Sequence, residues 1–184
     1  YNTIYKVDNQ GNILFQFNWY GGIASGLGWD GQYLYVAGLF EAQIHKLTPD
    51  GQWVQTIQTP LEQVTGLTWD GTYIWACDRP ASSLERSLVR FDSDWNVVEE
   101  IVLPFSVTLL DGLTWDGESF FICDAYDGMI YKLNRQGELL WAFPGPGSNA
   151  TECEWDGQYL WISDIVTDYI YQLDLSQPPD TTRI

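Results

Sequence analysis

The chain has 184 residues, with 8 Lys and Arg against 25 Asp and Glu, and a formal net charge of −17. A charge of that sign repels polyanions, which argues against nucleic acid as a partner. Hydrophobic residues make up 45% of the sequence and aromatic residues 16%, which excludes a disordered chain, and no apolar run reaches the roughly 18 residues of a membrane span. We therefore expect a soluble protein with one single domain over residues 1–177.

The first residues carry no targeting feature. The chain begins at Tyr1 with neither an initiator Met nor an apolar signal segment, so we expect a processed mature form or a piece of a longer chain. Both suit an exported protein, extracellular or periplasmic. Two apolar strands are predicted first, over residues 3–7 and 13–17.

A repeated pattern then dominates the sequence. Residues 26–38, 66–78, 112–124 and 152–164 are copies of it, and its tryptophans are 40, 46 and 40 residues apart: Trp29, Trp69, Trp115 and Trp155. Each copy predicts two strands joined by an Asp-Gly turn with positive φ at both central positions. An identical aromatic in every unit is typical of repeated packing, so the tryptophans are expected to be buried between units.

Each copy is followed by two further predicted strands. A third strand occurs five times, over residues 3–7, 43–47, 87–91, 129–133 and 169–173. A polar turn and an outer strand follow, over residues 13–17, 53–57, 97–102 and 139–143. The hairpin register places aromatic residues opposite Lys or Arg, as in the pair Trp75 and Arg90. This predicts either cation–π contacts or Lys and Arg side chains that extend to the solvent-exposed rim of the blade.

Antiparallel units of four strands and about 40–45 residues are typical of β-propeller blades. The run from Gly66 to Trp75, followed by an Ile-Tyr-Lys-Leu strand and a polar Gly turn, resembles the blades of bacterial exported propellers. It is more loosely similar to glutaminyl cyclotransferase-like and lactonase-like propellers. The expected fold class is thus all-β, a small β-propeller of four-stranded antiparallel blades.

The strand count leaves the closure of the ring open. We favour four blades, with residues 13–17 as the outer strand of the last blade and one third strand to spare. The alternatives are a five-bladed ring that lacks the inner hairpin of its first blade, or an incomplete ring completed by another copy of the chain. Residues 178–184 follow the last strand and are expected to form a C-terminal tail or linker.

The three cysteines have no paired spacing. Cys77 and Cys123 take one position of successive units, where Ala37 and Ser163 stand in the others, so that position requires a small side chain. We expect buried, inert thiols, including Cys153, and no disulfide between Cys77 and Cys123 because equivalent residues of neighbouring blades diverge.

Candidate site residues gather on the face formed by the loops between second and third strands. Asp78, Asp124 and Asp164 end second strands there, and Asp111, Glu152 and Glu154 begin first strands. Glu152 and Glu154 break the repeat, because the other copies have Gly, or Gly and Thr, at these positions. Carboxylates there predict a hydrated acidic channel, a possible Ca²⁺ at its mouth with no other cofactor, or a general acid/base pair.

Aromatic residues join the acids on the same predicted face. Loop residues of this kind suit sugar rings, but they also fill gaps between blades; they are Trp19, Tyr20, Phe40, Phe105 and Tyr126. His45 stands alone in a third strand, where a satisfied or partly exposed strand histidine is expected rather than a catalytic base.

The leading functional interpretation is a non-enzymatic exported propeller that binds or self-assembles, with other copies of the chain or with surface protein or glycan as partners. No motif positions a Ser or Cys nucleophile, so no catalytic residue is predicted. One alternative is a small propeller hydrolase or cyclotransferase that uses Asp111, Glu152 and Glu154, and another is a glycan-binding lectin. Since the strand count does not balance, the terminal strands are predicted to make a contact between chains, head-to-tail if the rotation does not close.

Overall fold

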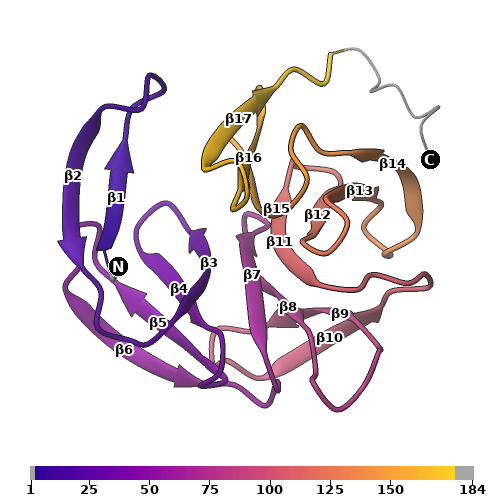
Figure 1. Cartoon of the computed structure of the whole chain (residues 1–184). Coiled ribbons are helices and arrows are strands. Elements are labelled where there is room, and N and C mark those ends of the chain that lie inside the picture. The colour runs from indigo at the N-terminus through magenta and orange to yellow at the C-terminus, as the bar shows by residue number, and fades with distance from the viewer. Residues whose placement is uncertain (1–2, 177–184) are drawn as a thin grey trace.

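The computed structural model describes residues 3–176, and every regular element in this range is a β-strand. The all-β prediction is therefore confirmed. The strands pair antiparallel into five sheets that stand side by side in an arc (Figure 1). Residues 177–184, which include the predicted tail, lie outside the described residues.

Three blades have the four predicted strands in the predicted order. Blade 1 consists of β3 (Ala24–Trp29), β4 (Leu34–Gly38), β5 (Gln43–Leu47) and β6 (Trp53–Gln58). Blade 2 consists of β7 (Val64–Trp69), β8 (Ile74–Asp78), β9 (Ser87–Phe91) and β10 (Val97–Val102). Blade 3 consists of β11 (Leu110–Trp115), β12 (Phe120–Asp124), β13 (Met129–Leu133) and β14 (Leu139–Pro144).

Two smaller sheets stand at the ends of the arc. Blade 4 has three strands, β15 (Ala150–Trp155), β16 (Leu160–Asp164) and β17 (Tyr169–Leu173). The terminal ribbon has two, β1 (Thr3–Val7) and β2 (Ile13–Asn18). Four inner hairpins thus define a propeller of four blades, with the ribbon beside blade 1 (Figure 1).

The predicted closure of the ring is wrong. Residues 13–17 were expected as the outer strand of the last blade, but β2 pairs with β1, and within residues 3–176 the sheet of blade 4 ends at β17. The reason is local, because β1 and β2 are consecutive and a short turn brings them together before any distant strand can compete. Within residues 3–176 the ribbon is a third and an outer strand without an inner hairpin, which agrees with both alternatives, the five-bladed ring that lacks this hairpin and the incomplete ring.

The Asp-Gly turns differ from the predicted two-residue turns. Each connection spans four residues, and only its glycine has positive φ, for example 96° at Gly71. The aspartate side chain stabilises the rest of the turn, because Asp70 Oδ1 accepts the N–H groups of Thr72 and Tyr73 at 2.9 and 2.7 Å. Its other oxygen accepts the indole N–H of Trp75 at 2.7 Å, so the turn is also tied to the second strand.

The hydrophobic core is divided into layers between consecutive sheets. One layer joins Tyr35, Ala37 and Ile44 of blade 1 to Leu67 and Ile74 of blade 2, and equivalent layers lie between blades 2 and 3 and between blades 3 and 4. Both faces of the second strands are covered, which explains why these strands are apolar throughout.

The prediction that all four repeat tryptophans are buried is wrong. Trp69, Trp115 and Trp155 are half-buried against the core layers, and Trp29 is 45% exposed. Their indole rings lie at the end of the first strand, where the turn leaves the sheet, so only part of each ring reaches the neighbouring blade. Blade 1 has no first or second strand packed before it among the described residues, and this leaves Trp29 the most exposed.

First strands of adjacent blades approach each other closely. A Cβ atom added at Gly66 would lie 2.3 Å from the carbonyl oxygen of Asp111, so only glycine fits there. Gly26 and Gly112 meet the next first strand in the same way. No described strand lies beyond β15, and this is why blade 4 can carry Glu152 at the equivalent position.

The predicted register and the state of the cysteines are both confirmed. The aromatic–base pairs Tyr35–Lys46, Trp75–Arg90 and Phe121–Lys132 face each other, and each base lies within 6 Å of its aromatic ring. All three cysteines are buried and free. Burial raises the pKa of the Cys77 and Cys153 thiols, which keeps them unreactive.

Candidate binding face

The loops between second and third strands form one face of the molecule, and the predicted aspartates organise it. Asp124 Oδ1 accepts the N–H groups of Leu109 and Tyr126, each at 2.9 Å, and its Oδ2 accepts that of Thr108 at 2.6 Å. Asp164 does the same in blade 4, and its bonds from Asn149 and Thr167 lower its pKa. Both side chains are buried, so they shape the loops rather than contact a ligand.

Asp78 is the third of these residues and the least satisfied. Its Oδ1 atom is buried without a hydrogen-bond partner, and burial raises the pKa of its carboxyl. The loop that follows it, residues 79–86, is longer than its equivalents and is held instead by arginine. The guanidinium of Arg86 donates to the carbonyl oxygens of Ser83, Glu85 and Thr108 at 2.9 to 3.0 Å.

Each of the four loops carries an exposed apolar side chain together with an exposed acid. The pairs are Phe40 with Glu41, Leu84 with Glu85, Tyr126 with Asp127, and Ile165 and Val166 with Asp168. The apolar members are among the most exposed large side chains of the molecule. We call this set the loop-tip pairs. Antiparallel blades of a propeller place these loops at the same end of every sheet, so the pairs share one face.

The predicted aromatic residues divide into two groups. Tyr20, Phe40 and Tyr126 are exposed as expected. Trp19 is not, because its ring is 3% exposed, stacks on Trp53 at 5.6 Å and donates its indole N–H to the Gly22 carbonyl. Phe105 packs on Tyr131 and is half-buried. Trp19 therefore fills the space beside blade 1 and belongs to the core, not to a binding face.

Asp111, Glu152 and Glu154 lie on the adjacent first strands β11 and β15. Asp111 forms an ion pair with Arg79, whose loop follows β8, and burial nevertheless raises its pKa. Glu152 Oε1 accepts the N–H of Leu113 at 3.3 Å and that of Cys153 at 3.2 Å, while its Oε2 is buried without a partner. Burial, with the nearby charges of Glu154 and Asp111, raises the pKa of Glu152.

Glu154 differs from these two acids because water reaches its side chain. Desolvation by neighbouring groups nevertheless raises its pKa to about 7. The structure therefore brings the three predicted acids near one another but gives each a different environment. Asp111 is paired with Arg79, and Glu152 accepts a hydrogen bond from β11. Glu154 lies on the open flank of blade 4.

Two expectations, one about a metal site and one about a membrane span, can be compared with the structure. Within residues 3–176 no group of three or more His, Cys, Asp or Glu side chains is arranged to hold a metal ion, so calcium at the channel mouth gains no ligand set and stays a prediction. The same part of the chain has no helix long and apolar enough to cross a membrane.

His45 occupies a buried strand position, as expected. Its ring lies 5.1 Å from Trp19 and 4.6 Å from Trp53, and burial lowers its pKa. One ring nitrogen contacts Thr56 and the other is buried without a partner, so the ring is only partly satisfied. It packs in the core and does not reach the loop face.

Several residues of the face were missed in the sequence. Leu84, Ile165 and Val166 were not predicted, because they are aliphatic where the other two loops have Phe or Tyr. The detectable signal was an acid in the same loop, Glu85 after Leu84 and Asp168 after Val166, as Glu41 and Asp127 follow the predicted Phe40 and Tyr126. Arg79 was missed because its partner lies on the next blade.

Comparison with known proteins supports the fold. No protein-family model matches the sequence, and a search of curated protein sequences found no relative. Among solved structures, the glutaminyl cyclase of Myxococcus xanthus matches with a TM-score of 0.76 at 11% identity, over 92% of this chain and 80% of that chain. A chain of a nidogen/laminin complex matches with a TM-score of 0.62 at 14% identity, over 94% of this chain and 85% of that one.

A third similar structure is the virginiamycin B lyase of Staphylococcus aureus. It matches with a TM-score of 0.55 at 16% identity, over 96% of this chain and 64% of that chain. Two of these three proteins are thus enzymes and one comes from a protein complex. At such low identities the similarity concerns the fold, which is a β-propeller in each comparison.

Proposed function

We propose that the chain is a non-enzymatic exported binding module whose loop face docks a cationic protein surface. The observation that carries this proposal is the set of loop-tip pairs, at least one exposed apolar side chain near one exposed acid in every blade. Exposed apolar side chains supply contact area, and carboxylates beside them select a positively charged partner.

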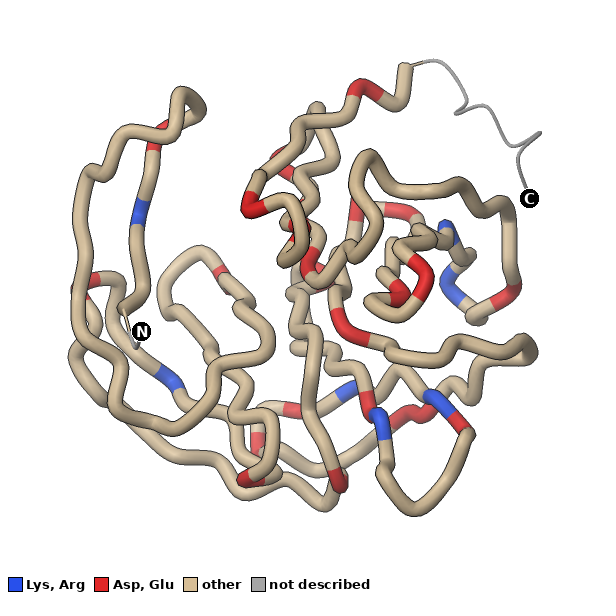
Figure 2. Tube along the Cα trace, in the orientation of Figure 1, with Lys and Arg blue, Asp and Glu red and all other residues tan. Residues whose placement is uncertain are grey.

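The charge distribution supports a cationic partner. Acidic residues occur along the whole ring, whereas Lys and Arg are few (Figure 2). Four of the bases are neutralised within the molecule, in the ion pairs Arg79–Asp111, Arg90–Glu99, Lys132–Asp116 and Arg135–Glu99. A strongly negative surface of this kind accelerates the association of basic partners and weakens it at high salt.

The test uses a synthetic Lys-Leu peptide as a probe of cationic, partly apolar character. Binding to the full chain is expected, with affinity that falls as ionic strength rises. The double substitution Phe40→Ser and Tyr126→Ser should weaken it about tenfold, and the control Leu139→Ser, at an exposed outer-strand position, should leave it unchanged. Binding that is insensitive to the double substitution would disprove the loop face as the site, and binding to a glycan panel instead would favour the lectin.

A second candidate function rests on Glu154. A carboxyl with a pKa of about 7 can accept and return a proton at neutral pH, as a general acid/base must. The structural similarity to a glutaminyl cyclase directs the assay to a peptide with N-terminal Gln. Release of ammonia that is lost in Glu154→Gln would establish the enzyme, and no release above the rate of the Glu154→Gln variant would exclude this activity.

A further inference from the structure

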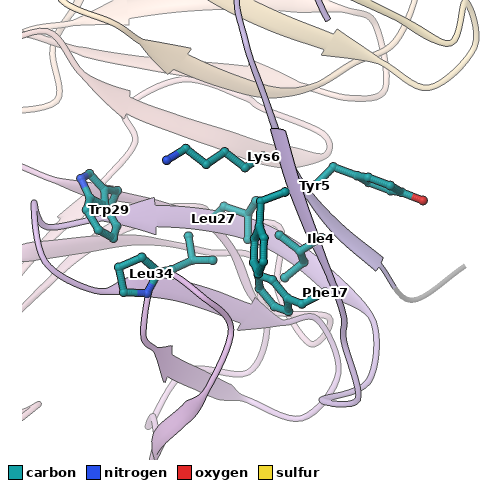
Figure 3. Close-up of a pocket in the computed structure, with 9 residues that line it drawn as sticks. Ile4, Tyr5, Lys6, Phe17, Leu27, Trp29 and Leu34 are labelled. Carbon is teal, nitrogen blue, oxygen red and sulfur yellow. The ribbon is translucent and has the colours of Figure 1, made fainter. Parts of the chain in front are cut away.

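A groove separates the terminal ribbon from the inner strands of blade 1. Its volume is about 400 Å³, and its walls are mainly apolar: Ile4, Phe15 and Phe17 come from the ribbon, and Leu27, Trp29 and Leu34 come from blade 1 (Figure 3). We propose that this groove binds a β-hairpin of the chain's own repeat type, which enters as the first and second strands of a sheet that the ribbon completes.

Equivalent positions along the chain show what covers this surface elsewhere. Leu27 is 40% exposed, whereas Leu67, at the same position of blade 2, is fully buried. Leu67 is covered by Tyr35 and Ala37, which belong to the second strand of the preceding blade. Blade 1 therefore presents a surface that, one repeat later, is sealed by an inner hairpin.

The ribbon already occupies the position of a third and an outer strand. Ile4 and Phe17 face each other across it, as Ile44 and Ile57 do in blade 1. They pack on Leu34 and on the core of blade 1, which is how Ile44 and Ile57 pack on blade 2. Among the described residues, the third strand β1 pairs with β2, and its other edge is where β5, β9 and β13 each pair with a second strand.

The junctions between first strands define the sequence that fits. Ser25 Oγ donates to the Val64 carbonyl and Thr65 Oγ1 to the Leu110 carbonyl, each at 2.8 Å across to the next blade. The glycine that follows each hydroxyl is required by the close approach of the neighbouring strand. The carbonyl equivalent to these acceptors in blade 1 belongs to Ala24. An occupant of the pattern Ser/Thr-Gly-Leu-x-Trp-Asp-Gly would continue the series.

The flank of blade 4 also lacks a neighbouring blade among the described residues. Trp161, Ser163 and Ile170 there are equivalent to Tyr35, Ala37 and Ile44, and Ile170 is 65% exposed where Ile44 is fully buried. Trp115 N–H donates to Thr68 Oγ1 at 3.1 Å, and Trp155 N–H donates to Thr114 Oγ1 at 3.0 Å. In each case the residue before one blade's tryptophan accepts the N–H of the next blade's tryptophan. Glu154 holds this position in blade 4, so its carboxylate is the acceptor for the backbone N–H of the occupant's tryptophan.

One residue limits how the occupant sits. Glu152 takes the place of the glycine that permits close approach at the other three junctions. The inner strand of the occupant therefore lies farther from β15 than β15 lies from β11, and its main contact is the groove wall of blade 1. The interface continues the strand-to-strand packing of the ring, which makes a hairpin of this sequence the fitting occupant.

The test uses a labelled synthetic peptide with the sequence of residues 24–38, which carries Tyr35 and Ala37 and lacks cysteine. Fluorescence anisotropy with the full chain should show saturable one-to-one binding. Hydrogen exchange should show new protection in β1 and β3. A peptide with Gly26→Val should bind more weakly, because its inner strand could not approach blade 1 closely.

Variants of the chain locate the site. Leu27→Glu should weaken binding about 10–100-fold, the loss expected when one leucine contact is replaced by a buried charge. Val98→Glu, at a position that is 47% exposed on the outer strand β10 and away from both the groove and the loop face, should bind as the unaltered chain does. Both substitutions are at exposed positions, and unchanged thermal melting confirms that the variants fold.

Three results would overturn the proposal. The peptide fails to bind a folded, monomeric chain, or its binding survives Leu27→Glu, or light scattering shows a dimer of the chain that the peptide dissociates. The third result would assign the groove to a second copy of the chain.

Discussion

At the scale of single residues, the turn aspartates carry more structure than a turn requires. Each binds two backbone N–H groups through one oxygen and a strand side chain through the other. The partners are Tyr35, Trp75 and Trp161 of second strands and, in blade 3, Lys132 of the third strand. The Asp-Gly signal predicted the turn, but the second bond could not be foreseen because it depends on a four-residue loop that the two-residue interpretation omitted.

A substitution at Asp70 tests this bond. Asp70→Asn keeps the side-chain shape, but its amide can present a donor to the indole N–H of Trp75, which is fully buried. We expect a loss of about 1–3 kcal/mol in the free energy of unfolding, measured by urea denaturation. Asp156→Asn is the matched control, because Trp161 is only half-buried and water can replace the bond. Equal losses in both variants would contradict the role of burial.

The acids of β15 predict how stability varies with pH. The folded protein raises the pKa of Glu154 to about 7 and that of Glu152 above its usual value, so the unfolded chain releases these protons at lower pH than the folded chain. Their contribution to stability is therefore fully present below about pH 4.5, the ordinary value for Glu, and is lost as the pH rises through the folded-state values.

Glu154→Gln removes one of these titrating groups. Its stability should fall less than that of the unaltered chain between about pH 5 and pH 8, and should be higher at pH 8. Melting temperature against pH is the measurement, with Glu118→Gln in an exposed turn as control. A variant that follows the unaltered pH curve would show that water screens Glu154 in the folded state.

At the scale of strands, the sequence predicted the positions and the order of the strands well. All five third strands have the predicted bounds, because apolar residues alternate with polar ones and polar turn residues follow each strand. Burial of individual side chains was less predictable. Trp29, Trp69, Trp115 and Trp155 are identical in the repeat, yet their exposure depends on what the preceding sheet contributes, and sequence periodicity does not carry that information.

Two tryptophan variants separate these environments. Trp115 packs on Phe120 with ring centroids 4.6 Å apart, and it is half-buried between blades. Trp115→Ala is expected to cost about 2–3 kcal/mol in the free energy of unfolding, below the range for a fully buried ring. Trp29→Ala should cost less than about 1 kcal/mol because that ring is 45% exposed. Denaturant unfolding of the two variants gives the comparison, and a larger loss at Trp29 would mean that the groove is closed in solution.

At the scale of the whole molecule, the propeller and its blade order could be predicted, but its closure could not. Either β1 or β17 can serve as the third strand beside β2, since both carry the same pattern, and only the proximity of consecutive strands decides between them. The loop face was partly predicted through Tyr20, Phe40 and Tyr126. Trp19 was assigned to it wrongly, because a loop position in sequence does not reveal that the ring turns inward onto Trp53.

The predicted contact between chains through the terminal strands stays a prediction. It is tested by the mass of the chain in solution and by deletion of residues 1–7. If the terminal strands join chains, the deletion should reduce the mass while the circular dichroism of the remaining strands persists. A chain that is monomeric at high concentration would exclude it.

The layered core has a consequence for how the molecule opens. Each blade is held by its immediate neighbours, and the largest interblade contacts join β3 to β7, β7 to β11 and β11 to β15. In such a linear array the inner units have two supports and the outer units have one. Hydrogen exchange should therefore be slowest in β8 and β12 and fastest in the terminal ribbon and β17, as a gradient of local unfolding that runs inward from both ends. Uniform exchange rates would mean that the two ends are coupled. The protein would then unfold cooperatively as a closed ring rather than blade by blade.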